Sequence, residues 1–358
     1  VNSSSMGNMS ERQSILDAGR FQVVTLNELQ DRALVIDGLS YHSDGYTGDL
    51  RTGGINALNV TVGHFEADFT ESCEQIAGWL AAMAAPDSEW APIRKAADLS
   101  TAQAAGKIGL IMGWQNMRPV ADDLDRIHLF HQLGVRVMQP TYNYRNFMGD
   151  GNLETEDAGL SILGRDAVRL LNELGIAIDI SHVGDQTSRD ILDLSTQPIL
   201  ATHVDARALT PLPRNKDDGI LRAVADSGGV IGVSVYGPML WDGDRNRRPS
   251  IDDFIRHLEY ITELAGKDHV GFGTDLPVSN DLRRTAQINV NRRLWSGISD
   301  YGDCFGHDIP ARYAMGANNH GKLPNITEAL LACGWPEADI EAYLGANFAR
   351  AFAEIWGG

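Results

Sequence analysis

The stretch Ile176-Ala177-Ile178-Asp179-Ile180-Ser181-His182 begins with apolar residues and ends with side chains that can hydrogen-bond or bind a metal. A second stretch of the same kind, Ile199-Leu200-Ala201-Thr202-His203, follows after an amphipathic segment. A third, Val230–Val235, is apolar at successive positions, as strands buried on both faces of a parallel sheet are. The alternation of such runs with helix-like segments predicts repeated β-strand and α-helix units.

The same alternation extends along the chain in both directions, and it predicts a (β/α)₈ TIM barrel. The predicted strands are Ala33–Asp37, Ala57–Val62, Ile108–Gly113, Val135–Pro140, Ile176–Ile180, Ile199–His203, Val230–Val235 and Val270–Thr274. The predicted helices include Glu71–Ala84, Leu124–Leu133, Leu163–Leu174, Gln186–Leu194, Leu221–Ser227 and Ile251–Leu264. A doubly wound open sheet is the alternative, but the glycine-rich turn of nucleotide-binding sheets does not follow the first strand.

The length of 358 residues suits one barrel of about 250 residues with insertions. We therefore expect a single domain over residues 1–358, with an N-terminal extension over about 1–30 and a helical tail over about 323–358. In the tail, Phe348, Phe352 and Ile355 recur at helical spacing, which predicts a closing helix packed on the barrel. The segment 280–322 is predicted to be rich in loops.

Composition excludes several classes of function. The formal net charge of -18 disfavours binding to nucleic acid or to an anionic membrane surface. The sequence has no run of about 18 apolar residues, so no membrane span is expected. Residues 1–19 are polar and contain no apolar segment of the secretory type. Three widely spaced cysteines, Cys73, Cys304 and Cys333, are typical of reduced core thiols and favour a cytoplasmic location.

Polar residues at the carboxyl ends of barrel strands face the active site in this fold class. His182, His203 and Asp275 follow the fifth, sixth and eighth predicted strands, and imidazole and carboxylate groups suit Zn²⁺ and related ions. Asp275 is also placed to accept a proton as a general base. A structural role as a hydrogen-bonded strand end is the alternative for each residue. His42 and His64 lie near the predicted mouth and remain candidates.

In these residues and in the motifs given below, the chain resembles the membrane (renal) dipeptidase family of zinc peptidases, within the amidohydrolase-like barrels. The resemblance runs from Val35-Ile36-Asp37-Gly38 to Asn347-Phe348-Ala349-Arg350. The motifs that carry it are Asp179-Ile180-Ser181-His182, Ala201-Thr202-His203, Pro213-Arg214-Asn215, Gly271-Phe272-Gly273-Thr274-Asp275, and Thr141-Tyr142-Asn143 with Gly149-Asp150-Gly151.

The resemblance implies a hydrolase that acts on a dipeptide or another small carboxylate-bearing amide, and it implies a homodimer. Arg214 matches the arginine that clamps a substrate carboxylate in the family, and Asn215 beside it is expected to bind substrate as well. A guanidinium can grip a carboxylate through two parallel hydrogen bonds. A surface salt bridge from Arg214 to Asp217 or Asp218 is the alternative that the sequence leaves open.

The resemblance fails at the residues that would hold two zinc ions. The family has a His-x-Asp pair after the first strand and a bridging Glu after the third, but this chain has Leu39, Tyr41 and Gln115 at those positions. A leucine cannot bind metal, and a neutral amide is a weaker ligand than a carboxylate. We therefore expect one ion, Zn²⁺ or another divalent metal, held by His182 and His203. The remaining ligands are expected to come from Tyr41, Gln115, His64 or water.

Two aromatic residues are expected near this ion. Trp114 and Tyr142 follow the third and fourth strands and are predicted to form a wall of the substrate pocket, although packing is an equal alternative for Trp114. Tyr142 and Asp275 are the residues expected to take part in the reaction. Three functions stay open: a dipeptidase-type metallohydrolase, a non-hydrolytic (lyase-type) enzyme on a small carboxylate, and a catalytically silent binding protein.

Overall fold

The computed structural model describes residues 26–281 and 299–357, and within them nine parallel strands form one sheet. Eight strands curl into a nearly closed barrel in the order β1-β2-β4-β5-β6-β7-β8-β9, and β3 pairs with the first residues of β4. The strands are β1 (Ile36–Ser40), β2 (Ala57–Thr61), β3 (Trp90–Pro92), β4 (Ile108–Trp114), β5 (Val135–Met138), β6 (Ala177–Asp179), β7 (Ile199–Val204), β8 (Val230–Val233) and β9 (Val270–Phe272).

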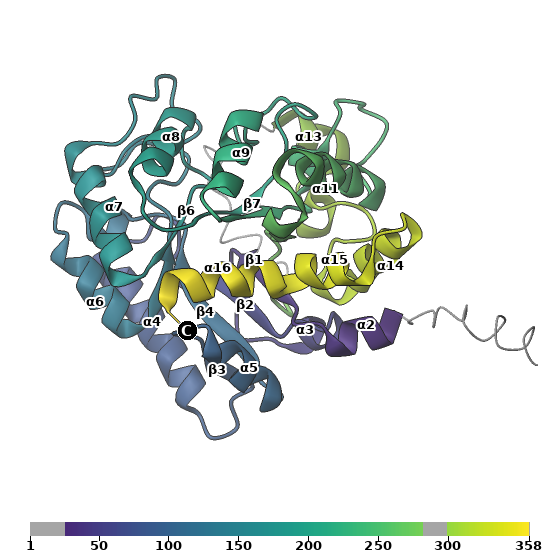
Figure 1. Cartoon of the computed structure of the whole chain (residues 1–358), viewed down its shortest axis with the longest axis horizontal. Coiled ribbons are helices and arrows are strands. Elements are labelled where there is room, and N and C mark those ends of the chain that lie inside the picture. Colours follow the sequence, from purple (N-terminus) through teal and green to yellow (C-terminus); the bar gives the residue numbers. More distant parts are fainter. Residues whose placement is uncertain (1–25, 282–298, 358) are drawn as a thin grey trace, which may run out of the picture.

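Helices surround the barrel and join successive strands, as Figure 1 shows for α6 to α9 and α11. The α-helices are α2 (Leu26–Arg32), α3 (Gly48–Thr52), α4 (Phe69–Ala84), α5 (Ala97–Ala104), α6 (Asp125–Leu133), α7 (Ile162–Leu174), α8 (Asp185–Leu194), α9 (Asp218–Asp226), α10 (Gly237–Leu240), α11 (Ile251–Ala265), α13 (Ser299–Phe305), α14 (Pro324–Ala332), α15 (Glu337–Glu341) and α16 (Asn347–Trp356). Short 3₁₀ turns are η1 (Arg118–Val120), η2 (Lys267–His269), η4 (Ile309–Arg312) and η5 (His320–Lys322), and a π-helical turn, η6 (Ala342–Ala346), precedes α16.

The predicted barrel is confirmed, with two corrections to the strands. The first strand was predicted over Ala33–Asp37, but it spans Ile36–Ser40, so Asp37 lies inside the strand rather than at its end. The polar residues Asp37 and Ser40 concealed the strand from a pattern based on apolar runs. The three-residue strand β3 was missed because Trp90-Ala91-Pro92 is too short to show a pattern of its own.

The buried carboxylate of Asp37 joins the first barrel strand to the last. Its Oδ1 accepts from the backbone N–H of Thr274 at 2.9 Å, and its Oδ2 accepts from the Thr274 hydroxyl at 2.6 Å. His320 Nε2 lies 2.8 Å from the same Oδ2. One backbone bond, from Asp275 N–H to the Leu39 carbonyl at 3.1 Å, runs beside this contact. The Asp37 side chain therefore joins β1 to β9 where a ladder of backbone hydrogen bonds would otherwise do so.

The floor of the barrel is formed by α16, which lies across the strands in Figure 1. The start of most barrel strands contributes a small or branched apolar side chain to a common cluster with this helix. The helix contributes Phe348, Ala351, Phe352 and Ile355, all of them buried. This arrangement confirms the closing helix predicted from the spacing of the two phenylalanines and Ile355.

Two glycines make room for the floor. A Cβ atom on Gly38 or Gly271 would lie 2.6 Å from the ring of Phe348, well inside van der Waals contact. Both glycines sit in or beside the strands that Asp37 joins. The packing of Phe348 therefore depends on the absence of side chains at these two positions, one on each side of the barrel closure.

Several helices begin at residues that the sequence marks as N-caps. Asp68 accepts from Glu71 N–H at 3.0 Å, and the Glu71 carboxylate accepts from Asp68 N–H at 3.0 Å, forming a capping box at the start of α4. Ser250 and Asp253 form another at the start of α11. These caps fix where the helices that follow β2 and precede β9 begin.

Three further predictions concern the cysteines, a membrane span and the segments outside the barrel. The three cysteines are free thiols, but none is buried in the core as predicted: Cys73 and Cys304 are partly exposed, and Cys333 is exposed at the end of α14. No helix within the described ranges has the length and apolarity needed to cross a membrane. Residues 1–25 of the predicted extension and 282–298 of the predicted loop-rich segment lie outside the described residues.

We predict that Phe348→Ala lowers the free energy of unfolding by about 3–5 kcal/mol, because it removes a buried ring at the centre of the floor. The measurement is urea unfolding followed by circular dichroism. Phe147→Ala is the matched control, because Phe147 is 58% exposed and its loss should change stability by less than about 0.5 kcal/mol. Equal effects of the two substitutions would contradict the role assigned to α16.

Candidate functional site

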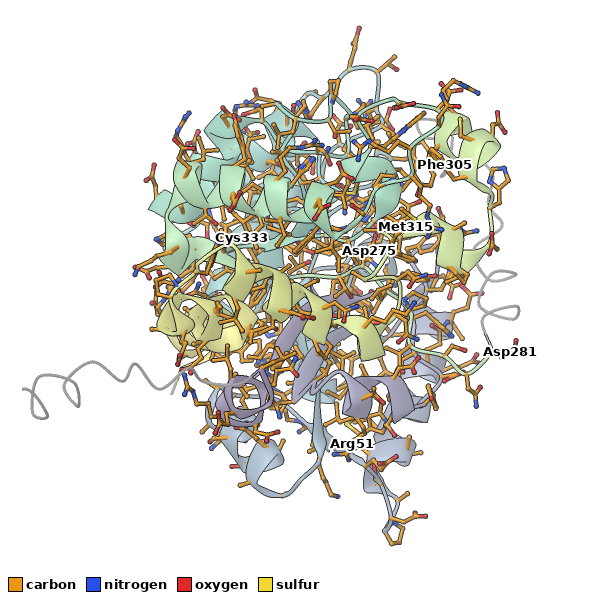
Figure 2. All side chains as sticks on the ribbon, turned by 90° about the vertical axis from the view of Figure 1, so that its right-hand side faces the viewer. Arg51, Asp275, Asp281, Phe305, Met315 and Cys333 are labelled. Atoms are coloured by element: carbon orange, nitrogen blue, oxygen red, sulfur yellow. The ribbon has the colours of Figure 1, made fainter. Side chains whose placement is uncertain are left out.

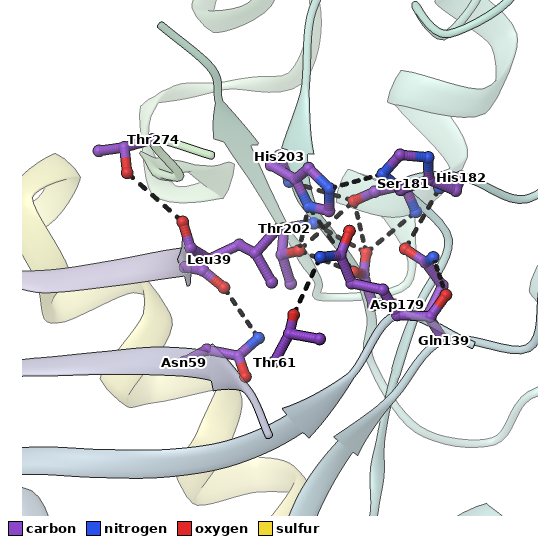
Figure 3. A network of polar contacts seen from close by, with 12 residues as sticks. Leu39, Asn59, Thr61, Gln139, Asp179, Ser181, His182, Thr202, His203 and Thr274 are labelled. Carbon is purple, nitrogen blue, oxygen red and sulfur yellow. Dashed lines mark hydrogen bonds and ion pairs between the residues drawn. The ribbon is translucent and has the colours of Figure 1, made fainter. Parts of the chain in front are cut away.

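His182 and His203 meet at the carboxyl ends of β6 and β7. Their Nε2 atoms are 3.1 Å apart, and both side chains are buried. The two residues follow neighbouring parallel strands, whose ends lie at the same rim of the barrel. Figure 3 shows them together above Asp179, Ser181 and Thr202. The two histidines that the sequence singled out are thus side by side.

The other ring nitrogen of His182 is held by Asn143. His182 Nδ1 lies 2.7 Å from Asn143 Oδ1, an oxygen that can only accept. The network therefore assigns the proton of His182 to Nδ1 and leaves a lone pair on Nε2. Asn143 reaches this position from a left-handed backbone conformation, with φ of 60°. Asparagine tolerates that conformation better than most residues.

The ring of His203 is oriented by a chain of hydrogen bonds that begins at Asp179. Thr202 Oγ1 donates to Asp179 Oδ2 at 2.7 Å, so its lone pairs remain to accept from His203 Nδ1 at 2.8 Å. His203 then also carries a lone pair on Nε2. Both Nε2 atoms therefore carry a lone pair at a distance of 3.1 Å, an arrangement that is favourable when one cation binds both.

Asp179 repeats at β6 and β7 the contact that Asp37 makes at β1 and β9. Its Oδ1 accepts from the N–H groups of Ser181 and Thr202, both at 3.0 Å, and from Ser181 Oγ at 2.6 Å. Burial raises the pKa of Asp179, while the hydrogen bonds from Ser181 and Thr202 oppose that rise. In both contacts a threonine is the partner, and the next residue, His203 or Asp275, belongs to the site.

Both imidazoles are neutral in this environment. Burial lowers the pKa of His182 and of His203 well below the usual value, and the positive charge of Arg214 lowers each further. Neutral imidazole is the form that binds metals. The pair is therefore kept in a state that can ligate a cation.

Arg214 points into the site rather than to the surface. Its Nη1 donates to the Ser181 carbonyl at 2.6 Å, and its Nη2 donates to the His203 carbonyl at 2.8 Å. Nη2 also lies 3.2 Å from His182 Nε2. These contacts put the guanidinium against the histidine pair.

The salt bridges that the sequence left open as an alternative for Arg214 do not form. Asp217 pairs with Arg189 at 2.6 Å, and Asp218 accepts from the Tyr260 hydroxyl at 2.9 Å. Both carboxylates are therefore engaged elsewhere, and the surface interpretation of Arg214 is wrong.

The two residues after Arg214 hold its loop in place. Asn215 is fully buried and donates from Nδ2 to the carbonyls of Thr210 and Met239, both at 2.9 Å. These bonds use both of its N–H groups. The next residue, Lys216, is also fully buried and donates to the Val183 carbonyl and to Ser188 Oγ. It thereby ties the Arg214 loop to the residue that follows His182.

Asp275 follows Thr274 at the end of β9 and adopts a left-handed conformation, with φ of 58°. Its carbonyl accepts from the Tyr313 hydroxyl at 2.7 Å, which fixes the turn. In Figure 2 Asp275 appears near the middle of the view, whereas Asp281 lies at the margin. Burial raises the pKa of the Asp275 carboxyl to about 7, against the opposing pull of Arg214. Asp275 can therefore exchange a proton near neutral pH.

Tyr142 lies flat against the histidine pair. Its ring stacks on His182 with centroids 4.1 Å apart, and on its other neighbour, Phe65, at 4.5 Å. Burial raises the pKa of its hydroxyl further above the usual range, so the phenol stays protonated. The ring is thus an aromatic wall beside His182, as expected.

The residues at the positions of the family's other ligands lie in or just after β1 and β4. Leu39 is buried, and Figure 3 shows its side chain directed into the barrel. Gln115 donates from Nε2 to Thr61 Oγ1 at 2.9 Å, and its Oε1 is buried without a partner in the described part of the chain. Tyr41 and His64 line a neighbouring cavity of about 680 Å³ together with Thr61.

His64 and Trp114 make contacts other than those expected of a metal ligand and a pocket wall. His64 Nδ1 accepts from Glu66 N–H at 3.2 Å, which places its proton on Nε2. Trp114 is buried in the outer core, with its ring 4.2 Å from that of Phe130 on α6. Gln115, one residue on, faces the opposite side of the strand. Packing is therefore the interpretation of Trp114 that the structure favours.

A single zinc ion fits the histidine pair. Two nitrogen ligands on a tetrahedral zinc stand about 3.3 Å apart, since each Zn–N bond is about 2.0–2.1 Å. The Nε2 atoms of His182 and His203 are 3.1 Å apart, and each carries a lone pair. Further protein ligands of the usual kinds are not seen: residues 26–281 and 299–357 hold no group of three or more His, Cys, Asp or Glu side chains arranged for a metal.

The barrel, the paired histidines at its carboxyl rim and the buried arginine beside them define the class of metal-dependent hydrolases built on an amidohydrolase-like barrel. The family model for membrane dipeptidase (peptidase family M19) matches residues 12–283. The chain belongs to this family, and it is an enzyme of the hydrolase class.

Individual relatives agree with this assignment. A crystal structure of an amidohydrolase from Pseudomonas aeruginosa is 30% identical and superposes with a TM-score of 0.81, covering 94% of this chain and all of that one. An uncharacterized protein in the pqqA 5' region of Klebsiella pneumoniae is 29% identical over 64% of this chain and 76% of its own length. A dipeptidase, tcpJ, of Claviceps purpurea is 27% identical over 73% of this chain, and the match spans 54% of that protein.

The supporting roles of three residues were not predicted from the sequence. His320 pairs with Asp37 from 283 positions away, and Asn143 depends on a backbone angle that no pattern reveals. Gln139 connects the backbones of two site residues: its Nε2 donates to the Gln115 carbonyl, and its Oε1 accepts from His182 N–H at 3.2 Å. The sequence offered one signal for two of these roles: Gln139 and Asn143 both follow the strand β5.

The buried lysine generates a prediction about stability and pH. Burial lowers the pKa of Lys216 from 10.5 to about 7, so the folded protein disfavours the charged form that the unfolded chain keeps. Stability should therefore rise as the pH increases from about 7 to about 10, by at most about 1.4 kcal/mol per pH unit from this group. Lys216→Met should flatten that rise.

The measurement is the free energy of unfolding in urea at three pH values between 7 and 10. The exposed Lys95 provides the matched control, Lys95→Met, which should keep the pH dependence of the original protein. If Lys216→Met and the original protein show the same slope, Lys216 does not titrate in this range.

Proposed function

We propose that this enzyme hydrolyses dipeptides or other small carboxylate-bearing amides at a site with one zinc ion held by His182 and His203. The observation that carries the proposal is the distance of 3.1 Å between the Nε2 atoms of His182 and His203. The Arg214 guanidinium lies against this pair. The remaining ligands come from water and from neutral oxygens, of which Gln115 Oε1 is buried and unpartnered among the described residues.

One ion is favoured over two for a reason of charge. A second dication a few Å away requires anionic ligands to offset the repulsion between the ions. At the positions where the family has its first-strand pair and bridging Glu, this chain offers a hydrocarbon, a phenol and a neutral amide. The histidine pair remains, and its proton positions suit one ion.

The protein's own residues supply binding and proton transfer. Arg214 holds the substrate carboxylate: its Nη groups are fixed by the carbonyls of Ser181 and His203, so little freedom is lost when a carboxylate binds. If zinc were held at His182 Nε2, the Arg214 N–H that now contacts this nitrogen would be left for the substrate. Asp275 accepts the proton during attack and returns it to the leaving amine.

A zinc ion at this pair supplies Lewis acidity toward the scissile carbonyl and toward water. Tyr142 limits the space beside His182 and keeps bulk water from that face of the ring, because it stacks on the imidazole. The site thus combines one acidic centre with a fixed carboxylate clamp and a nearby proton acceptor.

The names of relatives support a dipeptide-like substrate. The similar protein of Claviceps purpurea is called a dipeptidase. A metallopeptidase of Rhodobacter sphaeroides, which shares the fold with a TM-score of 0.74 at 21% identity over 90% of this chain and 99% of its own, was solved with a phosphinate mimic of the dipeptide L-Ala-D-Ala.

We predict about one equivalent of zinc per chain after reconstitution, and turnover of at least one dipeptide in a panel that varies both residues. His182→Ala should lower the bound zinc severalfold and abolish turnover, because half of the imidazole pair is lost. Metal content is measured by plasma mass spectrometry, and turnover by release of free amino acids.

His257→Ala is the control for loss of a buried histidine, because His257 lies on α11 and contacts Ala206 N–H rather than the histidine pair. Two equivalents of zinc would contradict the one-ion site. One equivalent without hydrolysis of any dipeptide would point instead to the non-hydrolytic alternative. Absence of bound metal after incubation with Zn²⁺, Mn²⁺ or Fe²⁺ would favour a binding protein.

We predict that Arg214→Ala raises KM for a dipeptide by about 30- to 150-fold, corresponding to about 2–3 kcal/mol for a charge-assisted contact. Arg189→Ala is the matched control, because this exposed arginine pairs with Asp217 outside the site and its loss should leave KM unchanged. An unchanged KM for Arg214→Ala would refute the clamp.

A further inference from the structure

A cavity of about 910 Å³ opens on the side of Tyr142 and is lined by three arginines, Arg118, Arg126 and Arg145. They come from different segments: Arg118 from η1, Arg126 from the start of α6, and Arg145 from the loop after β5. Three guanidinium groups around one cavity are unexpected in a chain with a net charge of -18. The site described above uses none of them.

Each guanidinium is held by a partner but keeps donors for another. Arg118 uses Nη1 for both of its bonds to Glu66, to the carbonyl and to Oε2, each at 2.7 Å. Arg145 uses Nε for Asp150 and Nη2 for the Glu156 carbonyl at 3.1 Å. Within the described residues, Nη2 of Arg118 and Nη1 of Arg145 make no hydrogen bond.

Arg126 is fixed in a similar way. Its Nη1 donates to the Pro119 carbonyl at 3.2 Å, its Nε lies 3.4 Å from an Asp123 carboxylate oxygen, and its guanidinium carbon lies 4.8 Å above the ring of Phe69. Its Nη2 forms no hydrogen bond to any described residue. The partners thus orient all three groups and leave one terminal nitrogen of each uncommitted.

Two carboxylates line the cavity beside the three arginines. They are Glu66, which is bound to Arg118, and Asp68, whose Oδ1 caps α4 by accepting from Glu71 N–H. Asp123 and Asp150 pair with the other two arginines, so the cavity offers an anion oriented N–H donors rather than an excess of positive charge. An anionic group entering the cavity would meet donors that are already oriented.

The wall between the arginines is rigid. Asn146 Nδ2 donates to Asn116 Oδ1 at 2.8 Å and to the Pro140 carbonyl at 2.7 Å. Asn116 Nδ2 donates to the Phe65 carbonyl at 2.8 Å. Two amide side chains therefore link the loops after β2, β4 and β5, so the cavity keeps its shape without a ligand.

Tyr142 connects this cavity to the histidine pair. It lines the cavity, and its ring lies 4.1 Å from that of His182. Arg214 Nη2 also contacts His182, at 3.2 Å from Nε2. A substrate whose carboxylate is held by Arg214 and whose scissile bond lies at the histidine pair can extend its amino-side residue past the edge of Tyr142 toward the arginines.

We propose that the three-arginine cavity binds an anionic group on the amino side of the scissile bond, so that the enzyme prefers dipeptides whose first residue is acidic. This inference rests on the proposed function. The negative net charge of the protein opposes the approach of a substrate with a second carboxylate, and charge-assisted hydrogen bonds from the oriented guanidinium groups offset that opposition.

The test compares Glu-Ala with Gln-Ala, two dipeptides of nearly equal shape that differ in one charge. The zinc-reconstituted enzyme should show a kcat/KM about tenfold higher for Glu-Ala, as a charge-assisted contact at a solvent-accessible site provides. Arg118→Gln and Arg126→Gln should each lower this ratio, and the double variant should bring it close to one. Because the readout is a ratio, a general loss of activity does not imitate the effect.

These two arginines suit substitution because their acidic partners, Glu66 and Asp123, are 37% and 50% exposed. Arg145 does not, because its partner Asp150 is buried and would be left without a counter-charge. Arg118→Lys should keep part of the preference. Arg169→Gln, at an exposed arginine on α7 paired with Asp166, is the matched control and should keep the full ratio.

Binding measured separately distinguishes failure of this inference from failure of the proposed function. Calorimetric titration of the chelator-treated protein with each dipeptide gives affinities without turnover. Tighter binding of Glu-Ala that is lost in the double variant supports the cavity even if neither dipeptide is cleaved. Turnover of both at equal kcat/KM overturns the cavity while hydrolysis stands. Equal or undetectable binding without turnover overturns both.

Discussion

The structure depends on a carboxylate that takes the place of backbone pairing. Asp37 accepts two hydrogen bonds from Thr274 and lies against His320, and this contact brings the last barrel strand to the first. Asp179 makes the same pair of bonds to Thr202 between β6 and β7. Each buried carboxylate is costly to desolvate, and each is offset by several donors. The residue after each threonine, Asp275 or His203, is thereby set at the rim of the barrel.

The parts of the fold that the sequence predicted well were the strands formed by runs of apolar residues. All eight barrel strands were predicted, because parallel strands buried on both faces are apolar at successive positions. The first was misplaced by a few residues because Asp37 and Ser40 are polar yet buried. The short strand β3 lies off the barrel path, and three residues carry no periodicity. Local pattern thus identified the barrel but not the side chain that closes it.

At the site, strand ends predicted which residues converge, but not which way they face. His182, His203 and Arg214 meet as expected. Trp114 and Gln115 are adjacent in sequence and point to opposite sides of β4, and only the packing against Phe130 decides which of them enters the outer core. The orientation of the His182 ring depends on Asn143, through a positive φ that sequence does not encode in a visible way. Proton positions, which decide whether a metal fits, follow from such contacts alone.

The floor of the barrel has a consequence for the order in which the protein is made. Phe348 fills the space between Gly38 and Gly271, yet it follows all eight barrel strands in the chain. During synthesis the strands leave the ribosome before the helix that completes their interior. Until residues beyond about 347 emerge, the barrel has an open apolar floor that other molecules can contact. Chaperones that bind exposed apolar surface could therefore meet the barrel until α16 emerges, and a chain that stops before residue 347 would have a barrel without a floor.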